Sequence, residues 1–81
     1  MKDLVEYLAK ALVDSPDQVR VNQREDEDTI IIELRVMSED MGKVIGKQGR
    51  IAKSIRSLVK ASASQDERKR IAVDIMSLDE E

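Results

Sequence analysis

The stretch that decides the fold is V-I-G-K-Q-G-R-I-A-K-S-I, which occupies residues 44–55. Two glycines, Gly46 and Gly49, bracket a basic and a polar residue, and apolar residues flank the pair on both sides. Ile51 and Ile55 follow at a helical interval of four. The stretch therefore predicts a glycine loop between two amphipathic helices, through which backbone amides could approach a sugar-phosphate chain. An ordinary helix–loop–helix corner would use the same glycines as caps. The rest of the sequence therefore has to distinguish a binding loop from a purely structural corner.

The charges of the chain are unevenly distributed. The net charge is −3, from 14 basic and 17 acidic residues. Residues 41–60 contain no acid and six basic residues, namely Lys43, Lys47, Arg50, Lys53, Arg56 and Lys60. The remainder holds 8 basic and 17 acidic residues, a net of −9. Because charges beyond about 8–10 Å are largely screened, this local basic patch can attract phosphate despite the acidic total. A merely solvated helix face would usually mix both signs.

Composition excludes several classes of function. Eighty-one residues predict one domain, 1–81. With no cysteine and no histidine, disulfides, zinc sites and the common catalytic triads are excluded, and no acid pair falls beside the glycine loop. We therefore expect no enzyme activity, catalytic residue, metal or cofactor. No apolar run approaches the roughly 20 residues of a membrane span, and the acidic, amphipathic N-terminus is unlike a secretory signal. A cytoplasmic protein without membrane partners is expected.

The first half of the chain predicts a helix and a hairpin. Residues 3–13 have a helical apolar stripe, and Pro16 disfavours its continuation. Alternation predicts strands at 18–24 and 29–36, joined by the acidic turn 25–28. The helical stripe is Leu4, Leu8, Ala11 and Leu12, widened by Val5, and the second strand turns Ile30, Ile32, Leu34 and Val36 to one side.

The second half predicts two helices and a strand. Ser38 is the expected N-cap of a short helix that ends at Gly46. A second helix covers residues 50–61, a polar loop 61–70, and a frayed acidic tail 78–81. The inward residues of the second helix are expected to be Ile51, Ile55, Leu58 and Val59, and the last strand alternates Ile71, Val73 and Ile75. The order is α-β-β-α-α-β, an α+β fold whose three-stranded mixed sheet carries its helices on one face.

The run V-I-G-K-Q-G-R-I resembles the signature of the KH (K-homology) RNA-binding domain, and the element order resembles its type II, prokaryotic form. The resemblance implies a KH core at about 29–76 and a narrow groove that grips about four nucleotides of single-stranded RNA. The implied RNA-binding residues are Gly46, Lys47, Gln48, Gly49, Arg50 and Lys53, with an aliphatic floor of Val36, Ile45 and Ile51 beside Val44.

Some assignments in that set stay open at this point. Ile45 and Ile51 could serve the core as well as the groove, and Gln48 could be a solvated loop tip. Arg68, Lys69 and Arg70 could form a basic rim opposite the loop, or pair with nearby acids in solvent. Tyr7 is the only aromatic residue, which disfavours the modules that stack bases on aromatic side chains.

Length, element order, the glycine run and the acidic tail together resemble the small bacterial single-KH proteins called KhpA. That resemblance implies a cytoplasmic RNA-binding protein, either a post-transcriptional regulator or an RNA chaperone, with an effect on cell elongation and division. It also implies a homodimer, or a heterodimer with a second KH protein of the KhpB/Jag type. Two alternatives remain: a protein-interaction module that contacts RNA incidentally, and a ribosome-assembly accessory factor. A pure scaffold would not need the basic patch.

Overall fold

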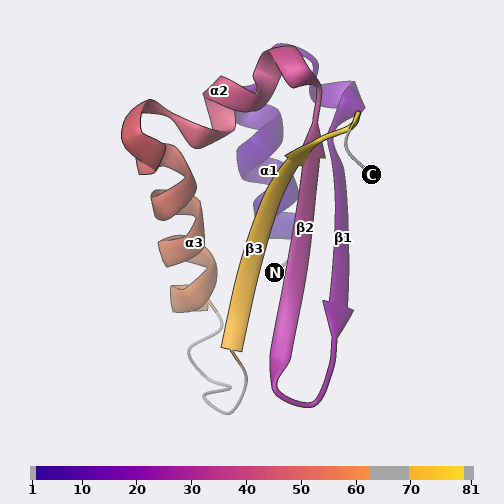
Figure 1. The fold of residues 1–81 in the computed structure, drawn as a ribbon, viewed down its shortest axis with the longest axis vertical. Helices are drawn as coiled ribbons and strands as arrows, with labels where there is room; N and C mark the ends of the chain where they lie inside the picture. Colours follow the sequence, from indigo (N-terminus) through magenta and orange to yellow (C-terminus); the bar gives the residue numbers. More distant parts are fainter. Residues whose placement is uncertain (1, 63–69, 80–81) are drawn as a thin grey trace.

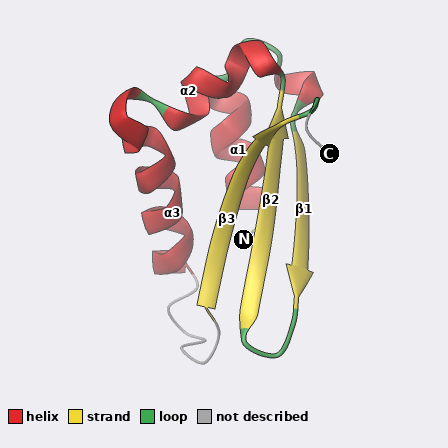
Figure 2. Ribbon diagram, viewed as in Figure 1, coloured by secondary structure: helices red, strands yellow, loops and turns green. Residues whose placement is uncertain are grey.

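The computed structural model describes residues 2–62 and 70–79, which form a three-stranded sheet with helices on one face (Figures 1 and 2). The strands are β1 (Arg20–Glu25), β2 (Thr29–Val36) and β3 (Arg70–Ser77), and the α-helices are α1 (Lys2–Leu12), α2 (Met41–Ile45) and α3 (Arg50–Ser62). Three single 3₁₀ turns, η1 (Pro16–Gln18), η2 (Ser38–Asp40) and η3 (Lys47–Gly49), stand at the connections. The predicted α+β class and element order are confirmed.

The sheet is mixed, with β2 in the centre. β1 pairs with β2 antiparallel, from Arg20 opposite Arg35 to Glu25 opposite Ile30. β3 pairs with β2 in parallel, from Thr29 beside Arg70 to Val36 beside Ser77. The parallel pairing requires a long crossover, which the two consecutive helices α2 and α3 supply. β1 and β3 are therefore the two edges of the sheet.

The first strand begins two residues later than the predicted 18–24. Pro16 opens the 3₁₀ turn η1, in which the Val19 amide donates to the Pro16 carbonyl over 3.2 Å. A proline is well suited to the first position of such a turn because its ring fixes φ near the helical value. Gln18 therefore belongs to the turn and β1 starts at Arg20.

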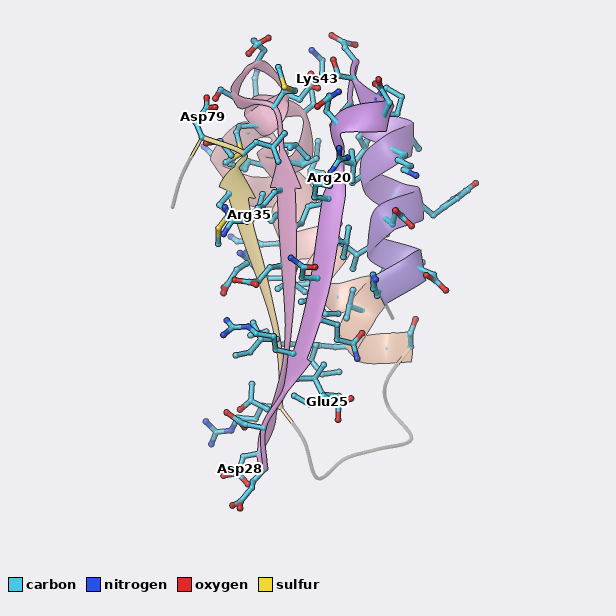
Figure 3. The ribbon with its side chains drawn as sticks, turned by 90° about the vertical axis from the view of Figure 1, so that its right-hand side faces the viewer. Arg20, Glu25, Asp28, Arg35, Lys43 and Asp79 are labelled. Atoms are coloured by element: carbon cyan, nitrogen blue, oxygen red, sulfur yellow. The ribbon has the colours of Figure 1, made fainter. Side chains whose placement is uncertain are left out.

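The core lies between the sheet and the helices. Ile30, Ile32, Leu34 and Val36 of β2 are buried as predicted, and Val73 of β3 joins them. On the opposite face of the sheet, β2 carries one apolar and three polar side chains, Ile31 with Thr29, Glu33 and Arg35; Arg35 is seen there in Figure 3. From the helices, the buried residues are Val5, Ala9, Val44, Ala52, Ile55 and Val59.

Two predictions about the helices were wrong. The buried side of α1 holds Val5 and Ala9, whereas Leu12 is 38% exposed. Leu58 of α3, expected in the core, is 49% exposed. Both helices are apolar over an arc wider than the sheet can cover, and packing buries only the part that faces the sheet.

The ends of α2 and of the chain also differ from expectation. Ser38 does not cap α2 with its side chain. Its hydroxyl donates instead to the Asp79 carboxylate over 2.6 Å, and the Leu78 amide donates to the Val36 carbonyl over 2.9 Å. The described part of the expected frayed tail, residues 78 and 79, is therefore held against the end of β2.

Candidate nucleic-acid interface

The glycine loop between α2 and α3 has an unusual backbone. Gly46, Gln48 and Gly49 have φ values of 75°, 57° and 76°, so three of four consecutive residues lie in the left-handed region. Only glycine adopts this region freely. The turn is closed by hydrogen bonds from the Gly46 amide to the Gly42 carbonyl, 2.9 Å, and from the Gly49 amide to the Gly46 carbonyl, 3.2 Å. The predicted loop is present, and its backbone is exposed along a tight turn.

The two glycines are required for different reasons. Gly46 combines its positive φ with a ψ of 177°, a conformation essentially restricted to glycine. A Cβ there would also lie 2.6 Å from Cγ1 of Ile51, which is a clash. At Gly49 a Cβ would meet nothing within 4 Å. Gly46 therefore lets the loop fold back onto Ile51, whereas Gly49 leaves the outer surface of the loop bare.

The helix α3 begins directly after the loop, at Arg50. The first turn of a helix has backbone N–H groups without intrahelical partners and carries a partial positive charge. Lys47, Gln48 and Arg50 are all exposed around it. The loop, the helix N-terminus and two cations therefore meet at one surface, which is an arrangement suited to phosphate.

Along α3 the side chains separate into three sides. Ala52, Ile55 and Val59 form the core side. At 100° per residue, the cations Lys53, Arg56 and Lys60 share a second side, which we call the basic side. The third side, which we call the uncharged side, holds Ile51, Ser54 and Leu58. The cations thus form a continuous strip that starts near the loop.

Arg56 connects this strip to the sheet. Its Nε donates to the Val73 carbonyl of β3 over 3.3 Å. β3 is an edge strand of the sheet, paired with β2, so this hydrogen bond holds the Arg56 side chain against an edge strand. The basic side of α3 therefore faces the free edge of β3. The sequence placed Arg56 in the basic patch, but its contact with β3 depends on tertiary packing.

A buried carboxylate holds α2 in place. Asp40, only 2% exposed, accepts hydrogen bonds from the amides of Asp14 and Ser15, at 3.3 and 3.2 Å. Lys43 of α2 donates to the Asp14 carboxylate over 2.8 Å. This hydrogen bond and the negative charge of Asp14 raise the pKa of Lys43. Sequence reasoning missed Asp40, whose partners are about 25 residues away. Lys43, counted in the basic patch, is engaged by an acid.

The predicted floor residues fall into two groups. Ile45 and Ile51 are partly buried and pack against the core from the two sides of the loop. Val36 and Val44 are 0% exposed. A side chain with no accessible surface cannot touch a ligand in this conformation, so the assignment of Val36 to the floor is corrected to the core.

Of the predicted basic rim, Arg70 alone belongs to the described residues. Arg68 and Lys69 lie outside the described residues. Arg70 is the first residue of β3 and donates its amide to the Asp28 carbonyl over 2.7 Å. The start of β3 lies at the opposite end of α3 from the glycine loop (Figure 1). Arg70 is separated from the site by the length of that helix.

Two other features are absent from residues 2–62 and 70–79. No group of three or more acidic, cysteine or histidine side chains is arranged to hold a metal ion there. In the same part of the chain, no helix is long and apolar enough to cross a membrane.

Comparison with known proteins identifies close relatives. The family described as KhpA/KhpB, KH domain, matches residues 2–75. The chain is 59% identical to RNA-binding protein KhpA of Clostridium perfringens over 76 residues, which cover 94% of this chain and 100% of that one. Identity to RNA-binding protein KhpA of Caldanaerobacter subterraneus is 60%, with the same coverage of both chains.

A solved structure has a similar fold. A crystal structure of Aquifex aeolicus Era bound to GDP.AlF4- matches with a TM-score of 0.61, over 95% of this chain and 30% of that one. Sequence identity is 16%, so this likeness concerns the fold alone.

Proposed function

The chain belongs to the KhpA/KhpB KH-domain family, and from that premise we propose that it binds single-stranded RNA at the loop formed by Gly46, Lys47, Gln48 and Gly49. The observation that carries the proposal is the backbone of this loop, with three positive φ angles, next to the N-terminus of α3. The relatives named above are RNA-binding proteins, which supports RNA as the ligand class.

The sugar-phosphate backbone would lie against the loop. Because Gly49 has open space where a Cβ would be, a phosphate can approach the loop backbone closely there. The partial charge of the α3 N-terminus and the side chains of Lys47 and Arg50 stabilise that phosphate. Contacts of this kind fix the position of the RNA strand but do not distinguish one base sequence from another.

The RNA strand would continue along the basic side of α3. Lys53, one turn after Arg50, is the next cation, and the free edge of β3 lies beside this side of the helix through the Arg56 contact. A loop of this type accommodates about four nucleotides. The bases would meet aliphatic side chains, with Ile45 and Ile51 partly exposed beside the loop.

Affinity for one domain should be modest. There is no aromatic side chain near the loop on which bases could stack, since Tyr7 lies on α1. Stacking contributes about 1–3 kcal/mol per base where it occurs. With a few ionic contacts instead, we expect a dissociation constant in the micromolar range, about −8 kcal/mol.

The test is an anisotropy titration of short unstructured RNAs with Gly49→Asp, alongside Gly49→Asn as the matched control. Asp and Asn are similar in size, and both tolerate positive φ better than most residues. Only Asp places a negative charge where phosphate is proposed to lie. Gly49→Asp should weaken binding at least about tenfold more than Gly49→Asn.

Substitution of Gly46 is a poorer test, because a side chain there collides with Ile51 and threatens the fold. Both Gly49 variants should keep the wild-type circular dichroism spectrum. Equal RNA affinity of the Asp and Asn variants would contradict the proposed site.

A further inference from the structure

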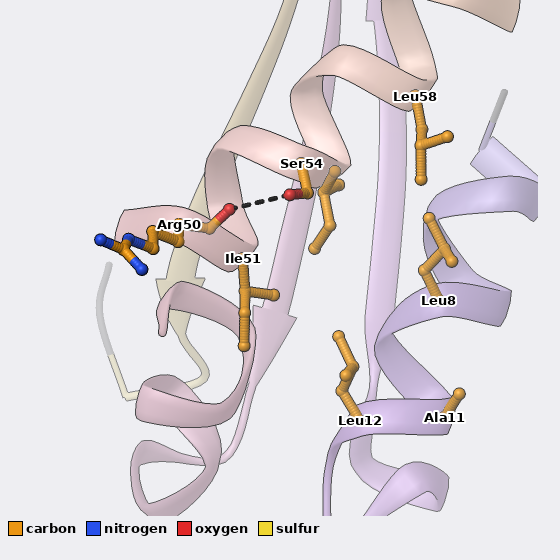
Figure 4. A pocket seen from close by; sticks show the side chains of 8 residues that line it. Leu8, Ala11, Leu12, Arg50, Ile51, Ser54 and Leu58 are labelled. Atoms are coloured by element: carbon orange, nitrogen blue, oxygen red, sulfur yellow. Dashed lines mark hydrogen bonds between the residues drawn. The ribbon is translucent and has the colours of Figure 1, made fainter. Parts of the chain in front are cut away.

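A groove of about 280 Å³ lies between α1 and α3 (Figure 4). Leucine and isoleucine side chains form most of its walls, among them Leu8 and Leu12 of α1 and Leu58 of α3. The only charged residue that lines the groove, Arg50, directly follows the glycine loop. Phosphate is bound by positive charge and hydrogen-bond donors, so this groove is poorly suited to a further segment of RNA.

The arginines of the three strands all lie on the open face of the sheet, away from the helices. Side chains alternate along a strand, and paired residues point to the same face. The pairing with β2 therefore places four arginines on that face, namely Arg20, Arg24, Arg35 and Arg70. Only two strand residues of this face are acidic, Glu33 and Asp74. The face thus has a net charge of +2 on a chain whose net charge is −3.

Three hydrogen-bond donors follow one another along the open face of β1. Arg20, Asn22 and Arg24 occupy alternate positions of this strand, and all three are exposed. We call them the donor ladder. At about 3.4 Å per residue they repeat about every 7 Å, which is similar to the length of one nucleotide in an extended strand. β1 is an edge strand, so a nucleic acid strand can run along it and meet several donors in turn.

The guanidinium group of Arg20 is held in position by the backbone. Its Nη1 donates to the carbonyls of Asp17 and Val19, each over 3.0 Å. Both acceptors are neutral, so these bonds orient the side chain without neutralising its charge. A guanidinium has five N–H donors, and an arginine that is already oriented loses less conformational freedom when it binds phosphate. Arg35, directly opposite on β2, places a second arginine beside it.

The acids of this face leave the donor ladder accessible. The Nη2 of Arg24 lies 3.5 Å from Oε2 of Glu33, but the Arg24 side chain is 63% exposed. Exposed ion pairs contribute little to stability, so a phosphate can share or replace this partner. Glu33 and Asp74 lie side by side on β2 and β3. The negative charge is therefore on the side of the sheet that is away from β1.

We propose that the donor ladder, together with Arg35, binds the sugar-phosphate backbone of a second segment of RNA. The inference takes RNA as the ligand from the proposed function, but none of its residues belongs to the glycine-loop site. That loop lies in the layer of helices, on the other face of the sheet (Figure 1). A segment of about four nucleotides at the loop therefore leaves the ladder to a different segment. The chain would then hold two segments of RNA, one on each face of the sheet.

The experiment is an NMR titration of the ¹⁵N-labelled chain with a short unstructured RNA at low salt. Wild type should show two separate groups of shifted amides, one around the glycine loop and one at residues 20–24 and 35. In Gly49→Asp the shifts around the loop should weaken, whereas the group on β1 should persist with the same dissociation constant. This variant separates the two sites.

Two double variants with the same change in net charge test the ladder itself. Arg20→Gln with Arg24→Gln should raise the dissociation constant of the β1 group at least about tenfold. It should also reduce the slope of log affinity against log salt by about 1.4, the loss of two phosphate contacts. Lys2→Gln with Lys10→Gln, on α1, should change the dissociation constant less than about twofold. Arg24→Gln alone leaves the backbone contacts of Arg20 in place and should raise the dissociation constant at least about threefold.

Several results would overturn the inference. One is a wild type without shifts at residues 20–24 up to about 1 mM RNA. Another is an equal loss of affinity in the two double variants, which would reduce the effect to net charge. Shifts of β1 with polyglutamate but not with RNA would assign the ladder to an acidic protein segment instead. If the β1 group shifts while the loop does not, the proposed function fails and this inference stands.

Discussion

Gly46 and Gly49 are equivalent in the sequence pattern but have different environments. Gly46 combines a φ of 75° and a ψ of 177° with a side chain, Ile51, packed against the space where a Cβ would be. Gly49 has a positive φ alone. At the scale of single residues, one glycine is needed to fold the loop, and the other leaves the loop surface open where we propose that phosphate binds.

This difference predicts unequal costs for the same substitution. Gly46→Ala should lower the free energy of unfolding by about 2–4 kcal/mol, from backbone strain and the clash with Ile51. Gly49→Ala should lower it by about 1–2 kcal/mol, from backbone strain alone. Urea denaturation of the two variants beside wild type measures the difference, and equal losses would contradict the packing of Ile51 described above.

Asp40 also has a structural role, because its buried carboxylate accepts two backbone hydrogen bonds. Asp40→Asn would turn an amide N–H₂ group toward a backbone N–H and leave a donor unsatisfied. The cost should be about 1–3 kcal/mol of unfolding free energy. Asp17→Asn, an exposed position, should change stability by less than about 0.5 kcal/mol. If Asp40→Asn left the free energy of unfolding unchanged, the two hydrogen bonds accepted by Asp40 would not be what holds α2 in place.

At the scale of elements, α3 has three sides, and each faces a different part of the molecule or its surroundings. Its core side packs on the sheet, its basic side runs from the glycine loop along the free edge of β3, and its uncharged side lines the groove with α1. Because a helix repeats every 3.6 residues, thirteen residues suffice to keep these surfaces separate. The basic side and the groove therefore use different parts of one helix and meet only at its first residues, Arg50 and Ile51, which line one end of the groove.

The division of α3 predicts opposite outcomes for two of its apolar residues. Ile55→Ala should cost about 2–4 kcal/mol, because Ile55 is 3% exposed in the core. Leu58→Ala should cost less than about 1 kcal/mol, because Leu58 is half exposed. Thermal or chemical denaturation at low concentration distinguishes them, and comparable losses would place Leu58 in the core after all.

The proposed function leads to a separate prediction about the basic side of α3, which concerns the salt dependence of RNA binding. Lys53→Gln should weaken RNA binding similarly for different short sequences and reduce the slope of log affinity against log salt by about 0.7, the loss of one phosphate contact on a single strand. Lys10→Gln on α1 is the control and should leave the slope unchanged. Anisotropy titrations at three salt concentrations supply both slopes. An unchanged slope for Lys53→Gln would remove that residue from the site.

At the scale of the whole molecule, the fold places two surfaces on one layer of helices. The loop and the basic strip of α3 lie toward β3, and the groove lies between α3 and α1. The open face of the sheet, with Arg35 and its neighbours, lies on the other side of the molecule (Figure 3).

Much of this architecture could be predicted from local sequence, because helices, strands and turns depend on residues close together in the chain. The 3.6-residue and two-residue periods located α1, α2, α3 and all three strands, and Gly46 and Gly49 located the loop, since each residue's preferred backbone conformation is local. The mixed sheet followed from the length of the two-helix crossover. The concentration of cations in residues 41–60 was likewise visible without coordinates.

Tertiary structure alone decided which surfaces face each other. Two apolar arcs of α1 were compatible with its sequence, and packing on the sheet buried Val5 and Ala9 and left Leu12 at the groove. The bonds of Asp40 to residues 14 and 15, the approach of Arg56 to β3 and the distant position of Arg70 depend on how the elements are placed in space. The physical reason is that periodicity reports how far an apolar arc extends around an element, whereas only packing decides which part of that arc is covered.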